Sequence, residues 1–240
     1  MSRSNPTENN SHPATKWFEW SGGDGAIRYY DKAEKRNIGY GDKFTFILLD
    51  QLSTIKGWHD SSQSSIYSNE VKDTRAQPFV VKSFKGGVIS EGLYANIKFN
   101  VAAAGGKFTT NLYIAYRDGS GPLQIGSLQF SGAALKEWME FAKQNRNEIY
   151  RKGIQIDGSK EGRKGSVVFK TPLFKLRDIS EETNGQAAAL DQHLQGFLTT
   201  YLKRTTAENA QRPVHSQEPP EEPPIDHTPA PEPPEDDIPW

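Results

Sequence analysis

Hydrophobic and polar residues alternate with a period of two in many short runs, which is the pattern of β-strands. The strongest run covers residues 43–52, where Phe44, Phe46 and Leu48 alternate with Ile47 and Leu49. Apolar side chains on both faces indicate a central strand of the sheet. Weaker runs predict further strands at residues 16–20, 26–32, 53–60, 66–71, 79–84, 108–117, 123–130, 153–157 and 166–176.

Three segments carry the longer period of a helix. Leu93, Ile97 and Val101 recur every four residues, and Gly105–Gly106 follows them as a helix end. The second helix is expected after Ser131, and the third is expected between residues 180 and 204. Many short strands with few helices predict a mainly β, α+β fold over residues 16–204, with the sheet closed into a barrel that carries helical insertions.

The two ends of the chain differ in composition from this body. Residues 1–15 are polar and are expected to form a flexible arm, and residues 205–240 hold ten of the fifteen prolines, which predicts a disordered acidic spacer. Residues 1–204 contain 28 Lys+Arg against 21 Asp+Glu, a net charge of +7, whereas residues 205–240 carry one arginine and nine acids, a net charge of −8. A basic body with an acidic tail indicates a polyanion-binding domain with a built-in competitor; the alternative is an ordinary solvated surface.

Several classes of protein find no support in the sequence. The chain has no cysteine, no run of about 18 apolar residues and no secretory signal, so we expect a cytoplasmic protein. It has no HExxH, P-loop or GxSxG motif, and its histidines stand apart from any acid or nucleophile pattern, so we expect no enzyme, no cofactor and no metal site. A nuclease-like cluster of Asp24, Asp31, Asp42 and Asp50 is the alternative, but their spacing is that of turns and strand ends.

Cations and aromatic residues are interleaved through the body, and these are the two groups that a single-stranded nucleic-acid site needs. Because residues i and i+2 of a strand share a face, Lys56 can accompany Trp58, and Lys82 can accompany Phe84. The predicted DNA-binding residues are Arg28, Tyr30, Lys56, Trp58, Tyr67, Lys82, Lys85, Tyr113, Tyr116 and Arg117. Aromatic residues in strands are more often core, and Trp58, Tyr67 and Tyr116 remain open between the two roles. Likewise, Lys160, Arg163 and Lys164 either close over a bound strand or are simply solvated.

The last six residues, Glu235, Asp236, Asp237, Ile238, Pro239 and Trp240, combine acidic charge with an apolar anchor. Such a peptide suits a basic surface that contains a hydrophobic pocket. It resembles the C-terminal tip of bacterial single-stranded DNA-binding proteins, in which aspartates precede Ile-Pro-Phe; Trp240 replaces the phenylalanine and Glu235 replaces an aspartate. In that family the tip docks replication and repair proteins and competes with DNA for the binding domain.

The body is similar to the single-stranded DNA-binding proteins of tailed phages over about residues 16–180. The resemblance rests on residues 29–32, 44–50, 54–57 and 67–71. It implies an OB-fold barrel whose groove is lined by the strands between residues 41 and 84. The expected function is to bind and protect single-stranded DNA in phage replication, recombination and repair, in the host cytoplasm, while the tip recruits a polymerase, helicase, nuclease or recombinase. The alternative is a protein-binding adaptor whose acidic tail mimics nucleic acid.

Overall fold

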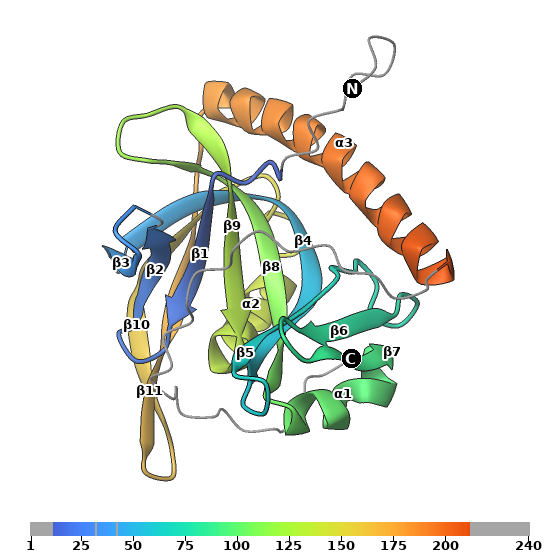
Figure 1. Cartoon of the computed structure of the whole chain (residues 1–240). Coiled ribbons are helices and arrows are strands. Elements are labelled where there is room, and N and C mark those ends of the chain that lie inside the picture. The colour runs from blue at the N-terminus through green and yellow to red at the C-terminus, as the bar shows by residue number, and fades with distance from the viewer. Residues whose placement is uncertain (1–11, 32, 42, 212–240) are drawn as a thin grey trace, which may run out of the picture.

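The computed structural model describes residues 12–31, 33–41 and 43–211, with the side chains of residues 206–211 excepted, as a mainly β, α+β fold (Figure 1). The strands are β1 (Lys16–Ser21), β2 (Ala26–Asp31), β3 (Arg36–Gly41), β4 (Lys43–His59), β5 (Ser64–Ser68), β6 (Phe79–Ser83), β7 (Gly87–Gly92), β8 (Gly106–Arg117), β9 (Leu123–Ser131), β10 (Gly153–Lys164) and β11 (Val167–Arg177). The helices are α1 (Tyr94–Ala103), α2 (Gly132–Gln144) and α3 (Glu181–Gln211).

All eleven described strands belong to one mixed sheet, whose main path has the order β3-β2-β1-β9-β8-β4-β5-β6-β7, with β10 and β11 off this path. The β1–β9 pair is parallel and the other strand pairs are antiparallel. The long strand β4 is central, as its apolar pattern predicted. It pairs with β8 along most of its length, with β10 through residues 43–47 and with β5 through residues 57–59, so the sheet branches at β4.

The predicted barrel is wrong, because the sheet stays open. Where the β1–β2 turn approaches β11, Lys170 donates its backbone N–H to the Gly22 carbonyl at 2.8 Å, and its carbonyl accepts from Trp20 Nε1 at 2.9 Å. No strand ladder forms there between the described residues. A strand that is apolar on both faces fits a barrel, and it fits equally well an open sheet that is covered on both sides.

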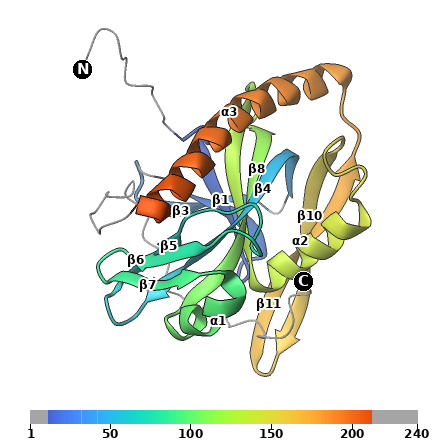
Figure 2. The ribbon, with the colours of Figure 1, turned by 90° about the vertical axis from the view of Figure 1, so that its right-hand side faces the viewer.

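Three hydrophobic clusters cover the sheet. The first holds α2 against one face, where Trp138 packs against Phe46, Phe130 and Phe174. The second holds α3 against the other face through Leu194 and Leu198, which pack with residues of β4, β8 and β9. Figure 2 shows α2 and α3 on either side of the sheet. The third lies under α1 and joins it to β4, β5 and β6. Among the described helices, none is long and apolar enough to cross a bilayer.

Some boundaries differ from the sequence-based expectation. Strands β3 and β7 were not predicted, because their glycines and polar residues give little alternation. Residues 158–165, between the predicted strands at 153–157 and 166–176, form the far end of the β10–β11 hairpin, and α3 continues past residue 204 to Gln211. The last residues of the predicted N-terminal arm are bound to the body, since the Thr15 N–H donates to the Ile125 carbonyl at 2.8 Å. The six-residue C-terminal tip lies outside the described residues.

Candidate nucleic-acid interface

Strand register gathers lysines and aromatic rings on one part of the sheet. Lys107 on β8 lies directly opposite Lys56 on β4, and Tyr67 on β5 lies opposite Lys82 on β6. Ser65 lies opposite Trp58, and its carbonyl accepts the N–H of Phe84 from the other side at 2.9 Å. We call the set Lys56, Trp58, Tyr67, Lys82, Phe84 and Lys107 the aromatic–lysine face.

The alternation of each strand decides which way these side chains point. Ile55, Ile66 and Val81 enter the third hydrophobic cluster beneath α1. The next residue along each strand, Lys56, Tyr67 and Lys82 respectively, therefore lies on the opposite side of the sheet. The predictions that Lys56 shares a face with Trp58, and Lys82 with Phe84, agree with this register.

Gly57, between Lys56 and Trp58, lets β4 run close to the turn that follows α1. A Cβ atom at Gly57 would overlap the carbonyl oxygen of Gly105. Gly105 itself has a φ of 91° and stands at the helix end that the sequence predicted. The tight approach brings β4 against this turn at the point where Lys56 and Trp58, both half-buried, lie on the side of the sheet opposite the third hydrophobic cluster.

Exposure and charge make this face suitable for a polyanion. Phe84 is 53% exposed, Lys85 and Lys107 are exposed, and Trp58 and Tyr67 are half-buried. Lys56 and Lys107 lie in register on neighbouring strands, which concentrates positive charge there, and the charge of Lys56 also acts on Glu70, where it opposes the burial that raises the pKa of that carboxyl. Glu91, opposite Val80 on β7, contributes one acid at the edge of the face.

Tyr113 is not available as a stacking platform, which corrects the sequence-based assignment. Its side chain is 1% exposed and lies in the cluster beneath α3. Its hydroxyl donates to Glu70 Oε2 at 2.6 Å, and Asn111 Nδ2 donates to Glu70 Oε1 at 2.6 Å. Burial raises the pKa of Glu70, although these two hydrogen bonds oppose the shift. Tyr201 of α3 completes the arrangement by accepting the Glu70 N–H at 3.1 Å.

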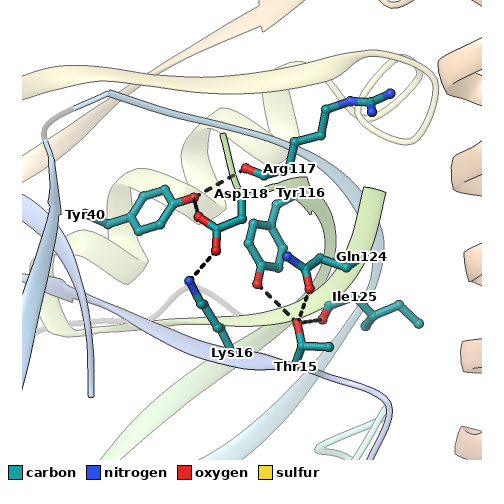
Figure 3. A network of polar contacts seen from close by, with 8 residues as sticks. All are labelled: Thr15, Lys16, Tyr40, Tyr116, Arg117, Asp118, Gln124 and Ile125. Carbon is teal, nitrogen blue, oxygen red and sulfur yellow. Dashed lines mark hydrogen bonds and ion pairs between the residues drawn. The ribbon is translucent and has the colours of Figure 1, made fainter. Parts of the chain in front are cut away.

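Tyr116 is also removed from the stacking candidates, because it is 1% exposed within the first cluster. Its hydroxyl is hydrogen-bonded to Thr15 Oγ1 at 3.1 Å, in a network that fastens the N-terminal segment to the β8–β9 turn (Figure 3). There Asp118 accepts from Lys16 at 2.5 Å and from Tyr40 at 3.0 Å, and these bonds lower the pKa of Asp118. The network stabilises the fold, and its hydroxyls and carboxylate are engaged within it.

Other predicted residues lie elsewhere. Arg28 and Tyr30 are on β2, near the other end of the strand order, and Arg28 Nε donates to Glu19 at 2.7 Å. Arg117 donates to Gln186 of α3 at 3.0 Å and to the Gly121 carbonyl at 3.2 Å. Lys85 directly follows Phe84 and adds a further cation beside the face.

The basic β10–β11 hairpin is also separate from the face. It projects at the lower left of Figure 1, away from β5–β7, and Lys160 pairs with Glu137 of α2 at 2.7 Å.

The sequence reading missed Lys107. It stands just after the glycines that end α1, and the next residues on its strand face, Thr109 and Asn111, are polar and not aromatic. Only the β4–β8 register, which joins residues far apart in the chain, puts it next to Lys56. No group of three or more His, Asp or Glu side chains within the described part of the chain is placed to hold a metal ion.

Comparisons with protein-family models, with curated proteins and with solved structures found no match to this chain.

Proposed function

We propose that this protein binds single-stranded DNA on the aromatic–lysine face. The observation that carries the proposal is the register of β8, β4, β5 and β6, which puts Lys107 opposite Lys56 and Tyr67 opposite Lys82 and so brings lysines and aromatic rings together on neighbouring strands. Neighbouring strands are about 4.8 Å apart, so a nucleic-acid strand crossing them meets a cation or a ring at each step. The lysines attract phosphates, and the rings stack on bases of any sequence.

The biological part of the proposal comes from the sequence. The resemblance of the body to tailed-phage single-stranded DNA-binding proteins supports a role in covering exposed strands during replication, recombination and repair. The acidic ending from Glu235 to Trp240 supports recruitment of partner proteins, with the indole as the anchor. The open sheet does not weaken this reading, because stacking and phosphate contacts need a groove or a face and not a closed barrel.

The decisive experiment is a titration of labelled oligo(dT), followed by fluorescence anisotropy, with the full chain and with Trp58→Ala. The loss of one stacking platform is worth about 1–3 kcal/mol, so we expect binding about 5- to 150-fold weaker. Trp58→Phe is the matched control, since it keeps an aromatic ring and should retain most of the affinity.

Three outcomes decide the matter. Tight binding by the wild-type chain that weakens in Trp58→Ala and is rescued in Trp58→Phe supports the proposal. Absence of oligo(dT) binding by the wild-type chain at low salt refutes it and favours the protein-binding adaptor. Equal binding by all three proteins, with unchanged thermal unfolding, refutes the placement of the site at Trp58. A matched RNA oligomer in the same titration determines the preference between DNA and RNA.

A further inference from the structure

A pocket with aromatic walls, separate from the aromatic–lysine face, lies between the N-terminal segment and the C-terminal part of α3. It is lined by His12, Phe197, Thr200, Tyr201 and Arg204. The four α3 residues are spaced three and four apart, which places them on one side of the helix. The Phe197 and Tyr201 rings are stacked with centroids 5.9 Å apart, and the His12 ring meets Phe197 edge-on at 5.3 Å.

The rings of this pocket are held in place by the fold. The N–H of Ala14 donates to His12 Nδ1 at 3.1 Å, so the neutral imidazole carries its proton on Nε2, 3.3 Å from the Tyr113 hydroxyl. Tyr201 is fixed from the other side by the N–H of Glu70. Rings that are already positioned lose little conformational freedom when a ligand stacks on them.

The pocket adjoins the aromatic–lysine face through Glu70, which comes three residues after Tyr67 of that face and donates its N–H to Tyr201 of the pocket at 3.1 Å. Burial of the His12 ring lowers the pKa of His12 to about 4, and the positive charge of Lys56 contributes to the same shift. At neutral pH His12 is an uncharged ring, and it extends toward Trp17, whose ring lies 5.3 Å away and which is 43% exposed.

The chemistry of the lining identifies the ligand. Aromatic walls suit a flat π-system, and the exposed guanidinium of Arg204 suits an oxyanion at the rim. Each nucleotide of single-stranded DNA carries both a flat base and a phosphate oxyanion. We infer that this pocket is a second base-stacking site for the same DNA strand, with Phe197, Tyr201 and Trp17 as candidate platforms and Arg204 as the phosphate contact. The inference rests on the proposed function and extends its binding path from β4 to α3.

The test compares oligo(dT) of increasing length on the full chain. Phe197→Leu removes a ring while keeping an apolar side chain, and Arg204→Gln removes the cation from an exposed position. Lys203→Gln is the matched control, because Lys203 is exposed on the same helix and does not line the pocket.

For long oligomers we expect about 5-fold or greater weakening in Phe197→Leu. In Arg204→Gln we expect a salt slope smaller by about 0.7. Short oligomers that occupy only the aromatic–lysine face should bind all these variants as they bind the wild type, and Lys203→Gln should match the wild type at every length.

Photocrosslinking of halogenated oligo(dT), with the crosslinked peptides identified by mass spectrometry, provides a direct readout. Crosslinks to peptides containing Trp17, Phe197 or Tyr201 support the second site. The inference is overturned if the wild type binds DNA and the pocket variants bind every length equally well.

It is also overturned if Phe197→Leu weakens binding of an added peptide of residues 235–240 and leaves DNA binding unchanged, which would assign the pocket to the acidic tip. If the wild-type chain binds no oligomer, both proposals fail. If only Trp58→Ala alters binding, the second site alone fails.

Discussion

The number of lysines on and beside the aromatic–lysine face predicts the salt dependence of DNA binding. Lys56, Lys82 and Lys107 belong to the face, and Lys85 adjoins it, which gives four cations. Each phosphate contact to a single strand contributes about 0.7 to the slope of log Kobs against log salt concentration, so four contacts give a slope of about −3. The combined substitutions Lys82→Gln and Lys107→Gln should reduce it to about −1.4.

The assay is an anisotropy titration of short oligo(dT), repeated over a series of salt concentrations. Lys136→Gln combined with Lys143→Gln is the matched control, because it removes the same net charge from exposed positions on α2, which covers the opposite face of the sheet. We expect this control to keep nearly the wild-type slope. Both double variants should unfold at nearly the wild-type temperature, since the substituted side chains are not part of a hydrophobic cluster.

Two results would refute this reasoning. If Lys82→Gln with Lys107→Gln leaves the slope unchanged, the phosphates do not follow the aromatic–lysine face. If the α2 control lowers the slope by the same amount, the lysines act through the overall charge of the body and not through local contacts.

Two further predictions concern Glu70 and Trp240. Burial raises the pKa of Glu70, so the folded state holds this proton at a pH where the unfolded chain, with its ordinary value of 4.5, has released it. The free energy of unfolding of the wild type should therefore fall as pH rises above that value, by up to about 1.4 kcal/mol per pH unit, and Glu70→Gln should lack this fall. Urea denaturation at several pH values measures both proteins, and the same pH dependence in both would contradict the prediction. Trp240→Ala should abolish capture of replication proteins from cell extract while leaving oligo(dT) affinity nearly unchanged, because the indole is the proposed anchor; undiminished capture would remove the tip from the proposal.

Local periodicity by itself determined much of the fold. The alternation in residues 43–52 identified β4 as central and apolar on both faces, and the four-residue repeat from Leu93 to Val101 identified α1 with its glycine end. The same two-residue period predicted that Lys56 accompanies Trp58, because successive side chains of a strand must point to opposite faces.

Tertiary structure decided what periodicity leaves open. Strand alternation says that Tyr113 and Tyr116 lie on opposite faces of β8, but not that α3 covers one face while the first cluster fills the other, and this burial removes both rings from the site. The open sheet was not predicted for the same reason, since an apolar strand face looks alike whether a barrel wall or a helix covers it. Lys107 joins Lys56 only through the β4–β8 register, and the pocket at His12 exists only because α3 crosses the N-terminal segment. Short-range patterns determine which way a side chain points, whereas contacts between distant segments determine what it meets there.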